Sequence, residues 1–296
     1  MKIAYITYSG NPSYTAANNF NEITDVLPFL QNKGLDIQLE VWDDAKVDWG
    51  MYDVALLKTP WDYHRKFKLF EEWLYKMQAL NITLLNDYQT VRWNFDKHYL
   101  REITEAGLGV VPSMFLDRGW TTGLDTIFGQ LQSNKIIIKP CISGGSVNTF
   151  VIDKNYTVKQ EADIVELAAD IDLIAQPFLH EIEQGEWSFI FFNGEYSHTI
   201  IKKPKEGDFR VQQAYGGTIE TVVPDNALIE IACQYIKQFA PDTLYARVDG
   251  LFVNNAFKLM ELELIEPFLY LSYSEGAMER YYKAILGKLG GISPRI

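Results

Sequence analysis

Short apolar runs alternate with helical stripes over residues 1–90. Runs of apolar and β-branched residues predict strands at residues 3–8, 37–42, 54–57 and 82–85. Between them, apolar residues at helical spacing predict one helix from Phe20 to Gly34, which Pro28 shortens or kinks, and a second helix from Phe67 to Met77. Strands that alternate with helices in this way predict a doubly wound parallel sheet.

After Asn86 the pattern changes and strands begin to dominate. Helices are predicted at residues 97–106, where Gly107 ends the helix, and at 228–239 and 278–285. Strands are predicted at residues 135–140, 147–152, 173–176, 187–192 and 196–202, and a hairpin at residues 244–264. This order predicts an α/β domain over residues 1–90, followed by two α+β lobes over residues 91–178 and 179–296.

The composition narrows the class of protein. The 296 residues include 27 Lys and Arg against 39 Asp and Glu, a formal net charge of −12, which argues against a general nucleic-acid binder. No uncharged apolar run approaches the length of a membrane span, and the first residues resemble a strand rather than a secretory signal. Cys141 and Cys233 are too few for a disulfide framework or a thiolate zinc site. We therefore expect a cytoplasmic globular protein without nucleic-acid or membrane partners.

Several common catalytic motifs are absent from the sequence. It contains no G-x-x-x-x-G-K-[ST] phosphate loop, no G-x-G-x-x-G fingerprint, no H-E-x-x-H and no G-x-S-x-G elbow. Any phosphate chemistry must therefore use another architecture.

Two lysines and a glycine-containing loop form the first candidate site. Lys139 ends an apolar strand just before the loop Ser143-Gly144-Gly145-Ser146, and Lys97 opens a helix. Two ammonium groups, and a flexible loop whose backbone N–H groups can approach closely, suit a triphosphate. A strand-end lysine followed by an ordinary turn explains the same local sequence equally well.

An acidic hairpin is the second candidate. Strand alternation puts Arg247 and Asp249 on one face of one strand, and Glu261 and Glu263 on one face of the next. Crowded carboxylates repel one another unless a cation joins them, and hard oxygen ligands of this kind suit Mg²⁺. A solvated strand face with alternating glutamates is the simpler alternative.

An extended segment with a proline is the third candidate. Gln176, Phe178 and Leu179 surround Pro177, and Glu183 and Glu186 follow. Such a link offers unpaired backbone groups to an adenine edge, and an acidic side chain can bind ribose hydroxyls. An exposed connecting loop is the alternative for this segment alone.

Together and in this order, the three candidates resemble the ATP-grasp ligases, most closely the glutathione-synthetase-like branch. The resemblance rests on Ile138-Lys139-Pro140, Gln176-Pro177-Phe178, Arg247-Val248-Asp249-Gly250 and Met260-Glu261-Leu262-Glu263. It covers about residues 86–275 and implies an ATP-grasp fold of two α+β lobes behind the α/β domain.

The resemblance also implies roles for the nucleotide-site residues. Lys97 and Lys139 would contact ATP, and the loop from Ser143 to Ser146, including Gly144 and Gly145, would cover the β- and γ-phosphates. The adenine and ribose contacts would come from Gln176, Phe178, Leu179, Glu186 and, less directly, Glu183.

For the reacting end of the nucleotide, the resemblance implies Mg²⁺ ligands at Asp249, Glu261 and Glu263. Arg247, with Arg210 as a further candidate, would face the transferred phosphoryl group and the acyl-phosphate. The sequence departs from glutathione synthetase at Glu263, a position often filled by Asn.

One further motif is similar to relatives of the cycloserine-pathway cyclo-ligase. Trp61-Asp62-Tyr63 would lie at the substrate end of the first domain, or it is a helix start with Asp62 as the N-cap.

The implied activity is ATP-dependent ligation of a small-molecule carboxylate to an amine through an acyl-phosphate, with ADP and phosphate as products. A nucleotide-binding regulatory protein and a peptide- or protein-modifying ligase are the alternatives. The sequence names neither substrate and leaves a homo-oligomer open.

The register of the acidic hairpin links the sequence to this chemistry. A two-residue turn at Asn254-Asn255 would pair Asp249 with Met260 and turn Glu261 to the opposite face. A three-residue connection would set Asp249 opposite Glu261 and Arg247 opposite Glu263. We therefore predict an odd-length connection and one shared face for these four side chains.

Overall fold

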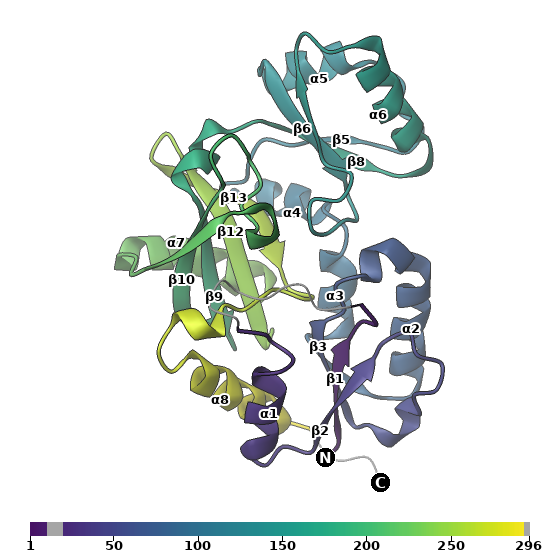
Figure 1. Ribbon diagram of the computed structural model, residues 1–296, viewed down its shortest axis with the longest axis vertical. Coiled ribbons are helices and arrows are strands. Elements are labelled where there is room, and N and C mark those ends of the chain that lie inside the picture. The colour runs from purple at the N-terminus through teal and green to yellow at the C-terminus, as the bar shows by residue number, and fades with distance from the viewer. Residues whose placement is uncertain (11–19, 293–296) are drawn as a thin grey trace.

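The computed structural model of the chain describes residues 1–10 and 20–292. Its N-terminal part is a four-stranded parallel sheet with the order β2-β1-β3-β4 (Figure 1). The strands are β1 Ile3–Thr7, β2 Ile37–Val41, β3 Val54–Thr59 and β4 Thr83–Leu85. The parallel sheet predicted from the alternating pattern is confirmed.

Helices α1 (Val26–Asn32) and α2 (Phe67–Ala79) cover opposite faces of this sheet (Figure 1). Tyr5 and Leu56 belong to the cluster that includes α1, whereas neighbouring strand residues such as Leu57 pack with the α2 residue Phe70. Successive strand residues therefore point to the two helical layers, which makes the sheet doubly wound.

The predicted helix from Phe20 to Gly34 is shorter in the structure. Asn21 Oδ1 accepts hydrogen bonds from the backbone N–H groups of Ile23 and Thr24, at 2.8 and 3.1 Å, and forms a turn before the helix begins. Pro28 then falls in the first turn of α1, where its missing N–H costs little.

The second sheet is antiparallel, with the order β5-β8-β6-β7. Its elements are β5 Met114–Leu116, β6 Lys135–Pro140, β7 Phe150–Asp153, β8 Leu173–Pro177, and the helices α5 Leu124–Leu131 and α6 Val158–Asp170. Ile136 and Ile138 of β6 pack with the two helices, so Ile137 and Lys139 point to the opposite face, which lines a cavity.

The third sheet is antiparallel and five-stranded, with the order β11-β10-β9-β12-β13. Its strands are β9 Glu186–Phe192, β10 Glu195–Lys203, β11 Thr218–Val222, β12 Tyr245–Val253 and β13 Ala256–Glu263. The remaining helices are α3 Tyr88–Asn94, α4 Tyr99–Glu105, α7 Asn226–Phe239 and α8 Ala277–Leu289. Short 3₁₀ turns lie at η1 Trp49–Met51, η2 Tyr63–Lys66, η3 His180–Gln184, η4 Gln213–Tyr215 and η5 Leu271–Tyr273.

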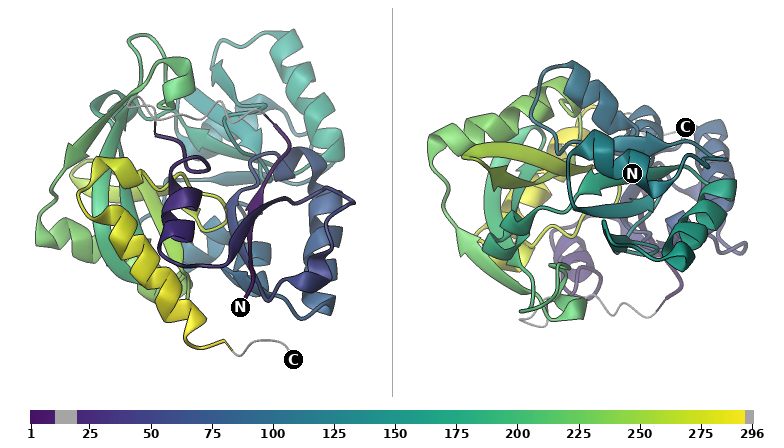
Figure 2. Two further views of the ribbon diagram at one scale, coloured as in Figure 1. Left: turned by 60° about the horizontal axis from the view of Figure 1, so that its bottom comes forward. Right: turned by 90° about the horizontal axis from the view of Figure 1, so that it is seen from above.

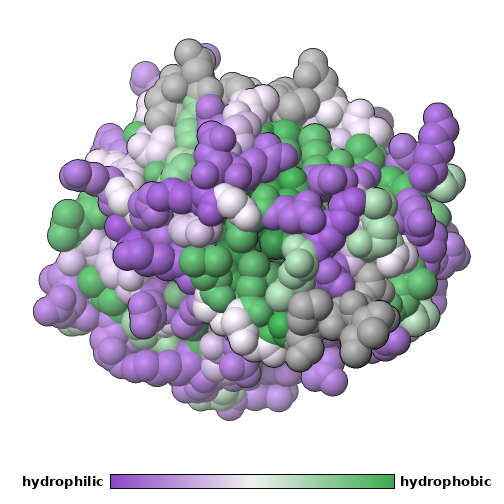
Figure 3. All heavy atoms as spheres, turned by 90° about the horizontal axis from the view of Figure 1, so that it is seen from below, coloured by the Kyte–Doolittle hydropathy of each residue, from purple (hydrophilic) through white to green (hydrophobic). Residues whose placement is uncertain are grey.

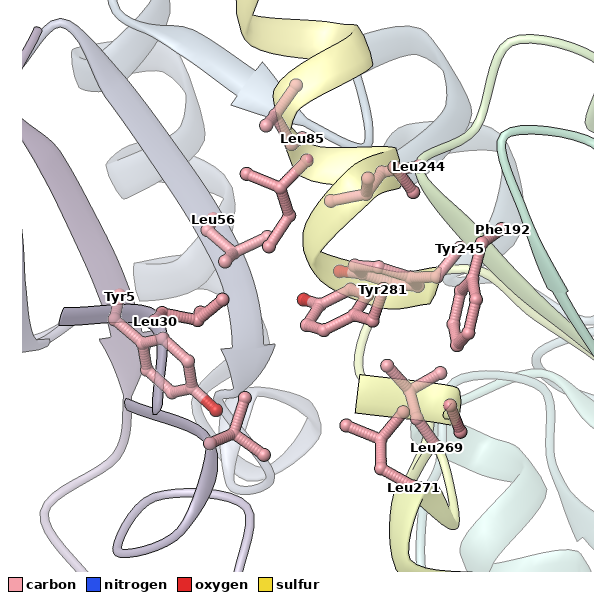
Figure 4. Close-up of a cluster of buried hydrophobic side chains, with 14 of the residues drawn as sticks. Tyr5, Leu30, Leu56, Leu85, Phe192, Leu244, Tyr245, Leu269, Leu271 and Tyr281 are labelled. Carbon is pink, nitrogen blue, oxygen red and sulfur yellow. The ribbon is translucent and has the colours of Figure 1, made fainter. Parts of the chain in front are cut away.

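One apolar cluster joins the first sheet to the third. Tyr5 and Leu56 face Phe192, Tyr245 and Tyr281 across this cluster (Figure 4). Figures 1 and 2 both show that α8 lies beside α1. Figure 3, the view of the molecule from below, shows apolar side chains near the middle of this face with polar side chains around them. Burial of these rings fixes the N-terminal sheet against the third sheet.

The prediction of a three-residue connection in the acidic hairpin is wrong. Val253 pairs with Ala256, so Asn254 and Asn255 alone form the turn. Both asparagines have positive φ, 51° and 61°, as a type I′ turn requires.

The predicted shared face is nevertheless correct, because β13 contains a β-bulge. Gly250 pairs with Leu259 but Asp249 pairs with Glu261, which leaves Met260 as the extra residue. The bulge moves the register by one residue and sets Arg247 opposite Glu263. A Cβ at Gly250 would overlap the Lys258 carbonyl oxygen and the Phe257 ring, so only glycine fits beside the bulge.

Within the described ranges, every helix is too short or too polar to cross a lipid bilayer.

Candidate active site

A cavity of about 650 Å³ is lined by side chains from all three sheets or the segments next to them. It includes every predicted site residue except Glu183, namely Lys97, Lys139, Ser143, Gly144, Gly145, Ser146, Gln176, Phe178, Leu179, Glu186, Arg210, Arg247, Asp249, Glu261 and Glu263. The Glu183 side chain is 70% exposed and faces His180 on η3. The short helix turns Glu183 away from the cavity, so the expected nucleotide contact at this residue is not supported.

The two predicted lysines reach the cavity from different elements. Lys97 lies between α3 and α4, and its backbone N–H donates to the Cys141 carbonyl at 3.1 Å, which ties it to the end of β6. Its Nζ donates to the Ser143 carbonyl at 3.1 Å and lies 3.4 Å from Glu261 Oε1. Burial lowers the pKa of Lys139, although the charge of Glu261 opposes the shift.

The glycine-containing loop is held from three sides. Besides the bond from Lys97, Gln212 donates to Ser146 Oγ at 3.2 Å, and Tyr215 donates to the Gly145 carbonyl at 3.5 Å. On the third side lies the His64 ring, since a Cβ at Gly144 would come within 3.1 Å of His64 Nδ1. The loop therefore spans the cavity between the N-terminal domain and the segment near η4.

Arg247 links the acidic residues of the hairpin. Its Nε donates to Asp249 Oδ1 at 3.0 Å, its Nη2 contacts Asp249 and Glu263, and its Nη1 donates to the Phe268 carbonyl at 2.9 Å. A guanidinium that is shared in this way satisfies two carboxylates at once and fixes its own orientation.

Lys202 is a second buried cation in the same network. Its Nζ lies 2.6 Å from Glu186 and 2.9 Å from Asp249. Although burial alone would lower its pKa, the charges of Asp249 and Glu186 raise the pKa of Lys202 well above its usual range. Lys202 is therefore charged whenever these carboxylates are.

The pKa values of the three hairpin carboxyl groups are shifted in different directions. Burial opposes ionisation of Asp249, but the charges of Arg247 and Lys202 hold its pKa below the usual value. The lysines near Glu261 likewise overcome its burial and lower its pKa. At Glu263, burial prevails over the charge of Arg247 and raises the pKa to about 8. A further cation near Glu263 would stabilise its ionised form and lower its pKa.

The donor set of the hairpin fits a hard divalent cation. Asp249, Glu261 and Glu263 offer only carboxylate oxygens from one face, the ligand type that Mg²⁺ prefers. Among the described residues, their donor atoms do not all come within 4.8 Å of one another. Those of Asp96, His98 and Cys141 do, but burial raises the pKa of the Cys141 thiol and disfavours the thiolate that a metal requires.

Comparison with known families agrees with this geometry. Residues 3–86 match the family model of the D-cycloserine synthetase DcsG N-terminal domain, and residues 125–254 match that of the prokaryotic glutathione synthetase ATP-grasp domain. The chain is an ATP-grasp ligase. The predicted family, fold and enzyme class, ligases that form C–N bonds, are thereby confirmed.

Individual relatives extend over almost the whole chain. The cycloserine biosynthesis protein DcsG of Streptomyces lavendulae is 23% identical over 282 residues, which are 90% of this chain and 94% of that protein. The crystal structure of D-cycloserine synthetase DcsG superposes with a TM-score of 0.82 at 20% identity, and covers 98% of this chain and 100% of its own.

More distant ligases share the fold. The Bacillus anthracis D-alanine–D-alanine ligase complexed with ATP gives a TM-score of 0.69 at 15% identity, with 97% of this chain and 96% of that chain covered. The ATP-grasp ligase PsnB complexed with its minimal precursor gives 0.64 at 14% identity, with 97% and 99% covered.

Sequence reasoning gave no role to three charged residues of the ligase cavity, Arg65, Lys202 and Glu266. The signal for Lys202 was the alternation along β10, where His198, Ile200 and Lys202 are all buried on one face. Glu266 carried no periodic signal, because it lies beyond the end of β13.

The Trp61-Asp62-Tyr63 motif lines the cavity from the N-terminal part of the ligase. Asp62 precedes η2, but its side chain makes no cap bond there. It accepts a hydrogen bond from Trp42 Nε1 at 2.8 Å and one from Lys66 at 2.9 Å instead. The helix-start alternative is therefore correct in position, since Asp62 is the N-cap residue of η2, but its carboxylate binds Trp42 and Lys66 and does not cap the helix.

We expect the metal-free ligase to lose stability as the pH rises from 6.5 to 8.5. The folded pKa values of Glu263 and Glu266 are both about 8 against a usual value of 4.5, so the folded state binds these two protons more tightly. The stability that this supplies is present in full below about pH 4.5 and is lost as the pH rises to about 8. Burial lowers the pKa of His64 and His198 from 6.5 to about 4, so they are neutral in the folded state but half protonated at pH 6.5 in the unfolded state. They therefore oppose part of the fall below about pH 7.5 and contribute nothing above it. The melting temperature should fall by roughly 2–5 °C.

Calorimetry in the presence of a chelator measures this fall. Glu263→Gln should reduce the slope without abolishing it, because Glu266 keeps its raised pKa, whereas the exposed Glu195→Gln should preserve the slope. An equal slope in both variants would contradict the assignment.

Proposed function

We propose that the ligase uses ATP to phosphorylate a substrate carboxylate and then passes the acyl group to an amine. The observation that carries this proposal is the convergence of four cations, Lys97, Lys139, Lys202 and Arg247, with the three hairpin carboxylates in one cavity. Nucleotide binding alone does not need this much charge, whereas phosphoryl transfer does.

In this proposal Lys97 and Lys139 hold the phosphates of ATP, and the loop from Ser143 to Ser146 covers them. Gln176, whose Nε2 donates to Ser113 Oγ at 2.9 Å, lies with Phe178 and Leu179 beside adenine. Glu186 would reach the ribose, with Lys202 beside it.

The chemistry needs no nucleophile from the protein. An oxygen of the substrate carboxylate attacks the γ-phosphorus, and the bond to ADP breaks. The amine nitrogen, in its neutral form, then attacks the acyl carbon, phosphate leaves with the C–O electron pair, and the phosphate takes up the proton that the nitrogen releases. Arg247 would orient the transferred phosphoryl group and Arg210 would assist, although Asp208 holds Arg210 at 2.7 Å in this structure.

Asp249, Glu261 and Glu263 would hold magnesium, which supplies charge neutralisation for phosphate oxygens when it is bound. In this proposal residues 1–90 form the side of the cavity that binds the substrate, and residues 91–178 and 179–296 enclose the nucleotide. Cys141 and Cys233 are free thiols, which suits a cytoplasmic enzyme.

Incubation with ATP, Mg²⁺ and a carboxylate panel, with hydroxylamine as the trapping nucleophile, tests the proposal. We expect stoichiometric ADP, phosphate and a hydroxamate from at least one carboxylate. AMP with pyrophosphate would overturn the acyl-phosphate route. Nucleotide binding without any turnover would indicate a regulatory protein.

A peptide-modifying ligase is the second candidate, favoured by the likeness to PsnB, which has been solved with its precursor. The same assay separates the two, because ADP release would then require a polypeptide and not a small amino acid. The net charge of −12 disfavours a strongly acidic polypeptide, since like charges slow encounter.

We expect the loop from Ser143 to Ser146 to exchange its amide hydrogens more slowly when ATP is bound. A loop that covers phosphates must open for nucleotide exchange, and side-chain contacts such as that from Gln212 attach it to the rest of the free protein. Hydrogen-exchange mass spectrometry with a non-hydrolysable ATP analogue measures this, with α6 as an internal reference. Equal protection in both states would argue against a lid.

A further inference from the structure

We propose that Glu266 binds the ammonium group of the amine substrate, so that the ligase selects nucleophiles whose nitrogen is carried as an alkylammonium. This inference rests on the proposed function. Glu266 lies three residues beyond the last residue of β13, and its side chain lines the cavity. It does not belong to the hairpin face that carries Asp249, Glu261 and Glu263.

The backbone around Glu266 is fixed on both sides. Its own carbonyl accepts a hydrogen bond from Trp61 Nε1 at 3.1 Å, and the Pro267 carbonyl accepts one from the buried Lys58 at 3.0 Å. The Leu269 N–H donates to the buried Glu22 at 2.6 Å. These bonds come from the N-terminal domain, so the Glu266 side chain is held at the point where that domain meets the cavity.

Glu266 differs from the other cavity carboxylates in its partners. Glu186 and Asp249 pair with Lys202, Glu261 with Lys97 and Glu263 with Arg247. In the described part of the chain, no ion pair includes Glu266. Burial, with the charges of Glu263 and Glu261, outweighs the charges of Lys97 and Arg247 and raises the pKa of Glu266 to about 8, so a cationic ligand beside it would stabilise its ionised form.

The surroundings favour an organic cation over a metal ion at Glu266. Tyr63 and Trp61 of the N-terminal domain line the same end of the cavity. The negative charge of Glu266 adds to the effect of burial in raising the pKa of the Tyr63 hydroxyl, which places the two side chains near one another. Aromatic walls stabilise an alkylammonium, whereas Mg²⁺ retains water and prefers oxygen ligands on several sides.

Binding of small probe amines to the full chain, with Mg²⁺ and ADP present, tests the inference without knowledge of the natural substrate. The probes are methylamine, glycinamide and both enantiomers of alaninamide, with acetamide as a neutral comparison. Dissociation constants come from ligand-observed NMR titration of the wild type, Glu266→Gln, Glu266→Asp and the exposed control Glu195→Gln. Manganese affinity is measured on the same variants by electron paramagnetic resonance.

We expect at least one amine, and not acetamide, to bind the wild type. Glu266→Gln should weaken that binding about 10- to 100-fold, as expected for loss of a charge-assisted hydrogen bond. Glu266→Asp should restore part of it, and Glu195→Gln should change it by less than about twofold. Manganese affinity should be unaffected in all variants.

Three results would overturn the inference: no probe amine binds the wild type, Glu266→Gln binds amines as well as the wild type does, or Glu266→Gln loses manganese affinity instead. The proposed function fails on a different observation, the absence of any carboxylate-dependent hydroxamate. Hydroxamate formation is measured on the wild type with hydroxylamine, which is neutral near pH 7 and needs no ammonium site, so the two failures are distinguishable.

Discussion

Replacing Glu261 by Gln should lower kcat/KM about 100- to 1,000-fold and leave the fold intact. Glu261 stands opposite Asp249 on the bulged hairpin, and both would hold the metal that neutralises the phosphates. In the metal-free protein burial and the charge of Asp249 disfavour the ionised form of Glu261, but Lys97, 3.4 Å away, and Lys139 outweigh both effects and lower the pKa of Glu261. The melting temperature without metal should therefore fall slightly when this charge is removed.

Coupled measurement of ADP release and calorimetry test both halves of this expectation. Glu263→Gln should lower turnover in the same way but keep or raise the melting temperature, because burial already raises the pKa of Glu263 to about 8. The surface variant Glu195→Gln should match the wild type in both assays. Retention of full turnover by Glu261→Gln would remove this residue from the metal site. Loss of the folded state would show that the carboxylate is structural.

Replacing Arg247 by Met should both abolish turnover and destabilise the ligase by about 3–5 kcal/mol, the usual cost of removing one partner of a buried ion pair. The variant leaves Asp249 and Glu263 without their guanidinium and the Phe268 carbonyl without its donor. The melting temperature should fall by roughly 10 °C.

Two further variants separate charge from geometry at Arg247. Arg247→Lys keeps the charge without the planar fork, so it should recover part of the stability and little of the activity. Adding Glu263→Gln to Arg247→Met removes one of the stranded carboxylates and should also recover part of the stability. Urea unfolding measures both; an Arg247→Met variant as stable as the wild type would contradict the account.

The local sequence pattern was sufficient to predict those helices and strands whose buried residues follow from their own periodicity. The apolar runs of β1 and β3 and the stripe of α2 predicted a parallel sheet because strands and helices bury residues at fixed periods. The motifs around Lys139 and Asp249 indicated the family, because phosphate and metal chemistry restricts which residue types can serve at those places.

The register of the acidic hairpin shows where local pattern was insufficient. The sequence predicted the right pairing of Asp249 with Glu261 through the wrong connection, since a two-residue turn was expected to misalign them. A bulge beside Gly250 corrects the register, and the space for it depends on how Phe257 packs against that glycine.

The sequence alone therefore determined the parallel first sheet, the ligase family and the residues of the hairpin, because periodicity and residue type are local properties. Only the tertiary structure decided which charged groups meet: that Lys202 lies between Glu186 and Asp249, that Glu183 points away, and that Glu266 faces the cavity. These outcomes depend on packing between segments distant in the chain, such as the bond from Trp61 to the Glu266 carbonyl, and no local pattern encodes such packing.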